Sequence, residues 1–415
     1  MFDNGFLISL SNEERRYLAL EPVASDADTL VLSRFRQSSH EMARTVLFFR
    51  GDHIVKVINE ELMVWVSNSW RYTYEEYDTW LQTENRQMLL PLTQRGKPKK
   101  LTITNVNAVM PFGCCLRITF GSNANKLKEI NLSNPRSCRY FPIGEKEAIN
   151  AIQSLEDFKA FLQHYIETCR EDYFDKLEAF KNAPKVTVKY KPGDIFRVDF
   201  DRTRYGYGII TSEVRSLRKM CDLSEDHGFN HLMGVPIIVR MYCIITENPA
   251  LTANDLADIP LDQAVYCFDN DIIWGTNPIV DHKVLEPEDL YFMLSCRVKT
   301  NFNGRFTLMG SSIVVEWGHA SANLDYEQMS EKLKGQLGDL PLCYQGVRTS
   351  IDEMLVPTEA IPLLKDNEYD LQHPDMKDIL AEVFACLGLE ADTDFDQFAK
   401  KFGGLTRRQI LDRTK

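Results

Sequence analysis

Two neighbouring stretches decide the fold of this chain: Tyr190-Lys-Pro-Gly-Asp-Ile-Phe-Arg-Val-Asp-Phe-Asp201 and Arg204-Tyr-Gly-Tyr-Gly-Ile-Ile210. Apolar and aromatic residues dominate both, and Gly193-Asp194 is a turn signal in front of the first. The pattern predicts strands over 195–200 and 205–211. Gly206 and Gly208 favour a strand that bends or lies close to another backbone.

The same pattern of short apolar runs separated by turns extends over 185–340. Short apolar runs follow at 236–245, 263–268, 272–274, 290–298, 306–309 and 313–317, and Asn303-Gly304 is a hairpin signal. Many short strands at this spacing predict a β-rich domain built as a barrel or a strongly bent sheet.

The flanking regions have other patterns. Residues 1–150 predict an α+β domain, with a capping box at Ser11-Asn-Glu-Glu14, a hairpin around Arg50-Gly-Asp52 and further strands, including one at 101–104. Apolar residues every three or four positions predict one connecting helix over 154–182, within a linker at 151–184. Residues 341–415 predict a helical tail, with helices from His373 to Gly388 and from Asp394 to Phe402. Plain core and partner binding are both open roles for the tail. The expected class is α+β.

Length and composition are those of a globular chain of two or three domains, with 415 residues and 44% hydrophobic residues. Ten cysteines are scattered without a C-x-x-C pair, which favours a reducing compartment. The N-terminus has no signal-peptide pattern, and no apolar run has the length of a membrane helix. We therefore expect a cytoplasmic protein.

Acidic residues outnumber basic ones, and the formal net charge is −12. Between Glu247 and Asp289 ten acidic residues accompany one basic residue, Lys283. Such a run is either a solvated loop surface or a docking surface for a cationic protein, because opposite charges speed encounter. The residues predicted to bind such a partner are Asp262, Asp269, Asp271, Asp281, Glu286, Glu288 and Asp289.

Catalytic motifs are missing from the sequence. It contains no nucleotide-binding glycine loop, no G-x-S-x-G and no H-E-x-x-H. One local cluster, Asp222, Glu225, Asp226, His227 and His231, leaves a metal-dependent hydrolase as an alternative. We expect no metal and no cofactor.

A second alternative is an RNA- or ribosome-associated module. Residues 185–220 carry nine basic and four acidic residues, interleaved with Phe196, Tyr205 and Tyr207. An acidic chain is poorly suited to phosphate contact, so a nucleic-acid partner is not expected. Core packing accounts for the aromatic residues equally well.

The two opening stretches resemble the immunity protein 26 family, which shows a K-x-G-D-x-F strand followed by a Y-G-[FY]-G strand. Similarity to longer members extends to the segment from His227 to Pro236 and to parts of the N-terminal region, about 1–320 in all. The resemblance implies a non-enzymatic bacterial protein that neutralises a cognate toxin of a polymorphic toxin system. It implies structural roles for Gly193, Asp194, Phe196, Tyr205, Gly206, Tyr207 and Gly208. Some relatives carry a phosphotriesterase label, for which this sequence offers no metal-ligand set.

Overall fold

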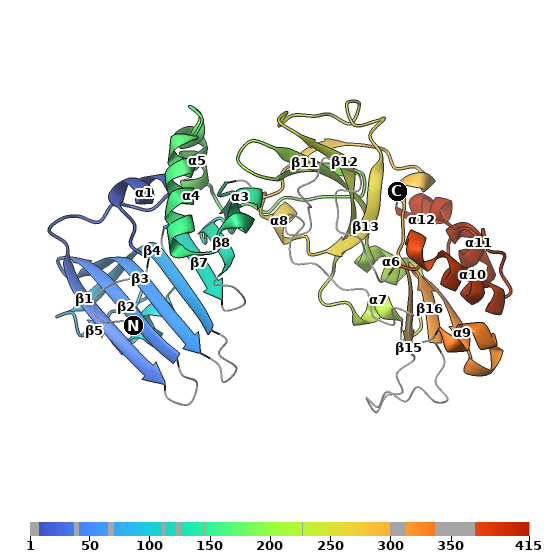
Figure 1. Cartoon of the computed structure of the whole chain (residues 1–415), viewed down its shortest axis with the longest axis horizontal. Helices are drawn as coiled ribbons and strands as arrows, with labels where there is room; N and C mark the ends of the chain where they lie inside the picture. The colour runs from blue at the N-terminus through green and yellow to red at the C-terminus, as the bar shows by residue number, and fades with distance from the viewer. Residues whose placement is uncertain are drawn as a thin grey trace. The chain divides into compact units, whose positions relative to one another are not determined.

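The chain forms two compact units, Met1–Thr187 and Val188–Lys415, which we describe separately (Figure 1). The computed structural model describes residues 8–36, 41–64, 70–109, 113–121, 126–144, 146–225, 227–298, 313–336 and 370–414. Among these residues no helix is long and apolar enough to cross a membrane. The predicted α+β class is confirmed.

The first unit is built on an antiparallel meander sheet in the order β1-β2-β3-β4-β7-β8-β9 (Figure 1). The predicted hairpin around Gly51 is confirmed, with β2 pairing with β3 and Gly51 at φ +60°. The short strands β5 (Met88–Leu89) and β6 (Lys99–Lys100) extend from β4. The main strands are β1 (Asp28–Arg36), β2 (Glu41–Arg50), β3 (His53–Val64), β4 (Trp70–Glu84), β7 (Cys115–Gly121), β8 (Lys126–Asn134) and β9 (Arg139–Phe141).

Helices cover one face of this sheet. Helix α1 (Asn12–Tyr17) begins at the predicted capping box of Ser11 and Glu14. Tyr72 and Tyr74 of β4 pack in one core with apolar residues of α4 (Leu155–Glu167) and α5 (Tyr173–Lys181). The opposite face packs against α2 (Ile103–Asn107), so the predicted strand at 101–104 was wrong. A further helix, α3 (Lys146–Ala151), contacts β8.

The prediction of a single helix over 154–182 was also wrong. Helix α4 ends at Glu167 and α5 begins at Tyr173. The hydroxyls of Tyr165 and Tyr173 lie 2.7 Å apart, whereas residues eight positions apart in one helix are about 12 Å apart along its axis. The aromatic contact therefore requires the break, and both helices pack in the core of the first unit.

The second unit begins with a five-stranded antiparallel sheet in the order β13-β12-β11-β10-β14. Its described strands form no closed barrel, because β13 and β14 are edges that do not pair with each other, which corrects the barrel alternative. Register shifts between Gly206 and Gly208 and between Ile210 and Ser212 mark irregularities where a strand bends. The strands are β10 (Asp194–Asp199), β11 (Tyr205–Glu213), β12 (Ile237–Thr246), β13 (Leu261–Cys267) and β14 (Ile279–His282).

Both faces of this sheet are buried. One face carries Ile209, Ile238 and Tyr266 and packs on helix α6 (Val214–Met220). The other carries Phe196 and Met241. It packs against helix α8 (Asn270–Ile273), where the sequence had suggested a strand at 272–274. The short helix α7 (Gly228–His231) and the 3-10 turn η2 (Pro287–Asp289) complete this region.

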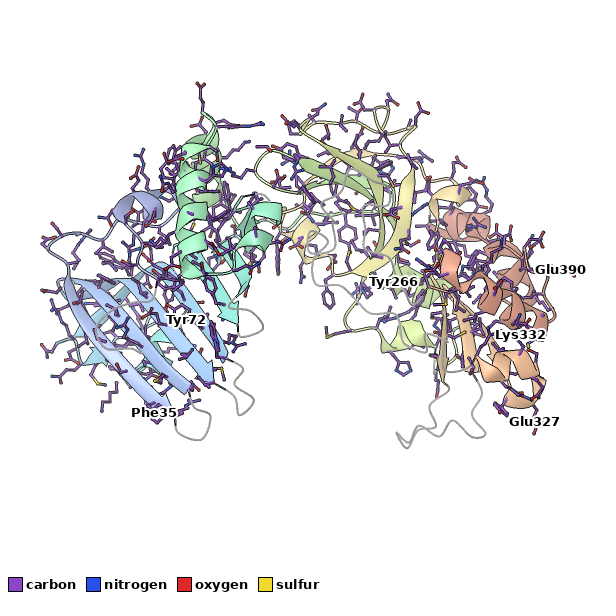
Figure 2. All side chains as sticks on the ribbon, viewed as in Figure 1. Phe35, Tyr72, Tyr266, Glu327, Lys332 and Glu390 are labelled. Atoms are coloured by element: carbon purple, nitrogen blue, oxygen red, sulfur yellow. The ribbon has the colours of Figure 1, made fainter. Side chains whose placement is uncertain are left out.

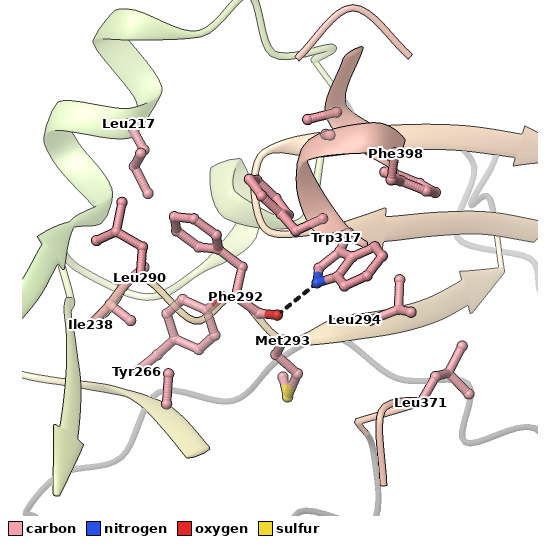
Figure 3. Packing of buried hydrophobic residues seen from close by; sticks show 14 of the residues in the cluster. Leu217, Ile238, Tyr266, Leu290, Phe292, Met293, Leu294, Trp317, Leu371 and Phe398 are labelled. Carbon is pink, nitrogen blue, oxygen red and sulfur yellow. Dashed lines mark hydrogen bonds between the residues drawn. The ribbon is translucent and has the colours of Figure 1, made fainter. Parts of the chain in front are cut away.

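A three-stranded sheet and the C-terminal helices continue the same core. Trp317 donates its indole N–H to the carbonyl of Phe292 at 2.9 Å (Figure 3). Its ring stacks on that of Phe384 and meets the ring of Phe398 edge-on. Phe384 and Phe398 of the tail are therefore part of the core of the second unit. The strands are β15 (Leu294–Val298), β16 (Ile313–Trp317) and β17 (Ala320–Leu324).

After β17 come the 3-10 turn η3 (Tyr326–Gln328) and helix α9 (Glu331–Gly335). The described helices of the tail are α10 (Lys377–Cys386), α11 (Phe395–Lys401) and α12 (Arg407–Thr414), with the 3-10 turn η5 (Pro374–Met376). They confirm the helices predicted from His373 to Gly388 and from Asp394 to Phe402. The predicted strand at 306–309, the Asn303-Gly304 turn and the tail between 341 and 369 lie outside the described residues.

Candidate functional site

The turn before β10 is closed by Gly193. Its φ is +95°, a left-handed value that favours glycine. A Cβ at this position would lie 2.3 Å from the carbonyl oxygen of Lys283, and the Lys283 N–H donates to the Gly193 carbonyl at 2.8 Å. Gly193 also donates to the carbonyl of Ile210 at 2.7 Å. The glycine thus lets three separate backbone segments meet.

Asp194, the next residue, is a buried carboxylate with two partners. It accepts a hydrogen bond from the Lys191 N–H at 2.9 Å, and its Oδ1 lies 2.9 Å from Nδ1 of His282. The first contact closes the 190–194 turn, and the second joins the turn to the end of β14. The Gly-Asp pair is therefore a structural junction.

The Tyr-Gly-Tyr-Gly strand packs tightly and holds a loop. A Cβ on Gly208 would lie 2.4 Å from the ring of Phe196, which is fully buried. Tyr205 is buried, with the guanidinium of Arg197 over its ring. Gly206 lies at a register shift toward β12.

Tyr207 links this strand to the loop that follows β12. Its hydroxyl donates to the Asn248 carbonyl at 2.7 Å and accepts from the Leu251 N–H at 3.2 Å. Asp281 holds the same loop by accepting from the Ala253 N–H at 2.7 Å, and this bond lowers its pKa. The loop between β12 and β13, which carries Glu247, Asp255 and Asp258, is therefore fixed at several points.

Two of the predicted partner-binding residues are buried, which corrects their assignment to an exposed face. Asp289 accepts from Lys283 Nζ at 2.7 Å and from the Glu286 N–H at 2.9 Å, so that it caps η2. Asp262 is 8% exposed and accepts from the Gln263 N–H at 2.7 Å. Buried carboxylates need such partners, and both residues have them.

Three more predicted residues are half-buried. Asp269 accepts from the Tyr190 hydroxyl at 2.7 Å, and burial, with this bond as a second cause, raises the pKa of Tyr190. Asp281 is engaged with the loop, as described above. Asp271 belongs to the short helix α8 and is half-buried. These three carboxylates are therefore only partly accessible to a binding partner.

Glu286 and Glu288 are the predicted residues that are exposed. Glu286 lies 3.4 Å from Arg408 of α12, with both side chains more than half exposed. Half-buried Arg240 donates to the carbonyls of Leu261, Asp262, Glu288 and Asp289 and so joins this turn to the start of β13. Exposed Asp258 lies just before that start. We call Glu286 and Glu288 the acidic face.

Residues 191–303 match the family model of immunity protein 26. The match begins at the Gly193-Asp194 turn and covers β10 to β15 with the acidic face, a narrower span than the 1–320 suggested by the resemblance. No curated protein and no solved structure was found to match the chain.

Residues 191–303, which match the family model and are called the immunity protein 26 region below, include most of the basic stretch that suggested RNA binding. Phe196, Tyr205 and Tyr207 are buried and cannot stack on bases. Arg197 pairs with Asp199 at 3.0 Å and Arg204 with Asp201 at 2.6 Å. These contacts favour the packing interpretation of the aromatic residues.

The two histidines of the predicted cluster do not lie side by side as predicted. His227 is buried and caps α7 by accepting from the Phe229 N–H, whereas His231 is exposed at the end of the same short helix. The four-residue helix excludes His227, so the two rings do not share a helical face. Among the described residues no three metal-ligating side chains gather, and Asp226 lies outside them.

Outside the immunity protein 26 region, the first unit holds a feature that sequence reasoning missed. Lys56 is 2% exposed, and its Nζ lies 2.9 Å from Glu76 and 2.6 Å from Asp78. Glu76 also pairs with Arg15 at 2.7 Å. These two cations hold the pKa of Glu76 low against the effect of burial, which itself raises it, while burial raises the pKa of Asp78. Lys56 and Asp78 line a pocket of about 870 Å³.

Proposed function

We propose that this chain is an immunity protein that binds a cognate protein toxin and neutralises it by stoichiometric occlusion, without catalysis. The observation that carries the proposal is the match of residues 191–303 to immunity protein 26. Such a protein needs a rigid surface of defined shape and charge and no reacting group of its own.

The packing of the immunity protein 26 region supports this role. Tyr207 and Asp281 fix the loop after β12, and Arg240 ties the turn that carries the acidic face to the start of β13. Pre-ordered loops lose little conformational entropy on binding, so more of the contact energy remains as affinity. A stable complex of this kind buries roughly 1,200–2,000 Å² in total.

The charge of the chain favours a basic toxin. Net charge is −12, and the acidic face places Glu286 and Glu288 in solvent on one turn. Exposed charges act mainly on the association rate and on specificity. Nucleases bind phosphate through Lys and Arg, so a nuclease toxin is the class that fits best.

The test begins with capture by the immobilised full-length chain at low and at high salt, followed by mass spectrometry. A captured basic candidate is then purified and titrated into the chain by calorimetry. We expect one-to-one binding that weakens as salt increases. A candidate that binds equally at both salt concentrations contradicts the electrostatic part, and one that stays toxic when co-expressed with the chain contradicts neutralisation.

The acidic face is tested by charge reversal. The double variant Glu286→Lys and Glu288→Lys is expected to slow association about tenfold or more at low salt. The matched control is Glu327→Lys with Glu390→Lys, two exposed residues elsewhere on the second unit (Figure 2). Equal slowing by both pairs would show a net-charge effect without a specific face.

A further inference from the structure

Strand β1 forms one edge of the sheet in the first unit (Figure 1). It pairs with β2 over nine residues, Asp28–Arg36, without a register shift. On its outer side no strand pairs with it in the described part of the chain. The backbone N–H and C=O groups that point outward from such an edge can pair with a further strand. This edge is therefore open to strand addition.

Several features that commonly protect an edge strand are missing from β1. The strand contains no proline and no lysine, it is longer than the roughly five or six residues of an average strand, and no bulge interrupts its pairing with β2. Arg34 and Arg36 both contact Glu41 of β2, and Asp28 lies 2.8 Å from Arg86. The charges at the two ends of the strand nevertheless remain accessible, because the side chain of Asp28 is 66% exposed and that of Arg36 is 54% exposed.

One face of β1 carries exposed apolar side chains. Val31 is 53% exposed and Phe35 is 65% exposed, and the two lie four positions apart on the same face of the strand (Figure 2 labels Phe35). Phe35 pairs with Met42 of β2, which is also exposed, so the apolar face continues on the neighbouring strand. On the opposite face, Leu30 and Leu32 pack against the core that contains α2. Large apolar side chains in solvent on an open edge indicate a site of association.

The sequence of β1 is complementary to itself in the antiparallel direction. The register that pairs all nine residues of two copies is centred on Leu32. In this register Asp28 lies opposite Arg36 of the second copy at both ends of the ladder, and no two like charges lie directly opposite each other. Phe35 lies diagonal to Val31 of the second copy, so the apolar faces of the two strands meet on one side of the joined sheet. Charge and apolar pattern therefore favour the same occupant of the edge, a second copy of this chain.

We propose that two copies of the chain associate through β1, joining their sheets into one antiparallel sheet with a twofold axis at Leu32. The pairing satisfies the outward backbone groups of both strands and covers Val31 and Phe35 of both copies. The same strand is used on both copies, so the assembly closes at two. A single added ladder buries less area than a permanent dimer, so the association is weak and depends on concentration. The inference is independent of toxin binding and concerns the unit that lies outside the family match.

Sedimentation velocity of the full-length chain tests the proposal. We expect monomer at about 1 µM and mostly dimer at about 300 µM, since a small interface gives a dissociation constant on the order of 10–100 µM. Phe35→Lys should raise this constant about tenfold or more, because the twofold symmetry places the new charge in the interface twice. Tyr140→Lys, at an exposed residue of β9 on the other edge of the sheet, is the matched control. A chain that stays monomeric, one that forms a series of larger species, or a dimer that Phe35→Lys leaves unchanged overturns the proposal.

A charge exchange tests the register. Asp28→Arg places arginine opposite Arg36 at both ends of the ladder, and Arg36→Asp places aspartate opposite Asp28, so each variant alone should dimerise about tenfold or more less well. A mixture of the two variants restores opposite charges at both ends, so a heterodimer should form with close to wild-type affinity. A mixture that does not recover association, although both variants keep the wild-type circular dichroism spectrum, overturns the proposal. If either variant fails to fold, the wild-type chain and Phe35→Lys decide.

Discussion

Nδ1 of His282 lies 2.9 Å from Oδ1 of Asp194. This contact joins the Gly193-Asp194 turn, where the family match begins, to the end of β14, just before the turn that carries the acidic face. The residues at which the family match begins and the residues proposed to meet a partner are therefore linked through one structural junction. Changes in the motif should act on stability first and on binding through the loops that it supports.

Gly193→Ala should destabilise the second unit by at least about 2 kcal/mol. The substitution places a Cβ 2.3 Å from the Lys283 carbonyl at a φ of +95°, so both backbone strain and overlap contribute. Gly403→Ala is the matched control, because Gly403 has a φ of +77° with nothing within 4 Å of the added carbon. Its expected effect is about 1 kcal/mol. Urea unfolding measures both, and equal losses would contradict the role assigned to close packing at Gly193.

Tyr207→Phe should loosen the loop that follows β12 without unfolding the sheet. The change removes the hydroxyl that bridges Asn248 and Leu251, and we expect a loss of about 1–2 kcal/mol. Hydrogen exchange should speed up at residues 248–253 while β11 and β12 stay protected. Tyr326→Phe, on a half-exposed tyrosine, is the control. Unchanged exchange in the loop would show that Tyr207 does not hold it.

Local signals in the sequence predicted local structure well. Ser11 and Glu14 predicted the start of α1, Gly51 the β2–β3 hairpin, and the Lys-Pro-Gly-Asp and Tyr-Gly-Tyr-Gly stretches the strands β10 and β11. The short apolar runs at 101–104 and 272–274 were misassigned, because runs of three or four residues have no period that separates strand from helix. The single helix predicted over 154–182 is broken between α4 and α5, because the hydroxyls of Tyr165 and Tyr173 meet in the folded chain.

The candidate sites were harder to predict, because they depend on contacts between distant residues. The acidic run indicated where carboxylates are concentrated in the sequence but not which of them are exposed. Asp289 is buried beside Lys283, and Asp262 is buried at the start of β13. Composition alone does not distinguish a carboxylate in solvent from one that closes a turn. His319, a buried residue outside these sites, meets Leu405 across 86 positions, and no local pattern marks that pair.

Stability should fall as pH decreases, with a contribution from His319. Its pKa is about 4 in the folded chain, mainly because of burial, against about 6.5 in the unfolded chain. The unfolded chain therefore binds more protons between these values, and the free energy of unfolding falls as pH drops from 6.5 to about 4. The expected contribution is about 3 kcal/mol, since a tenfold change in proton affinity corresponds to about 1.4 kcal/mol.

Urea unfolding at pH 7 and pH 4 checks this contribution. His319→Gln does not titrate in this range, so its loss of stability between the two pH values should be about 3 kcal/mol smaller than that of the wild type. An equal loss in both proteins would contradict the assignment.

Phe398→Ala should destabilise the second unit by about 3–5 kcal/mol. Phe398 is fully buried against Trp317 in the core that β15–β17 share with the C-terminal helices (Figure 3). Val284→Ala removes apolar atoms from a residue that is 71% exposed, so it should change stability by less than about 0.5 kcal/mol. Thermal unfolding compares the two variants. A small effect of Phe398→Ala would show that the tail is not part of the core.

Neutralisation is the central claim, and co-expression measures it most directly. A partner captured by the chain is expressed in a bacterial host alone, with the wild-type chain, and with the Glu286→Lys and Glu288→Lys variant at matched levels. The account predicts that the partner alone stops growth, that the wild-type chain restores it, and that the variant restores it less well. Growth arrest that continues in the presence of excess wild-type chain, although the two proteins bind, would contradict it.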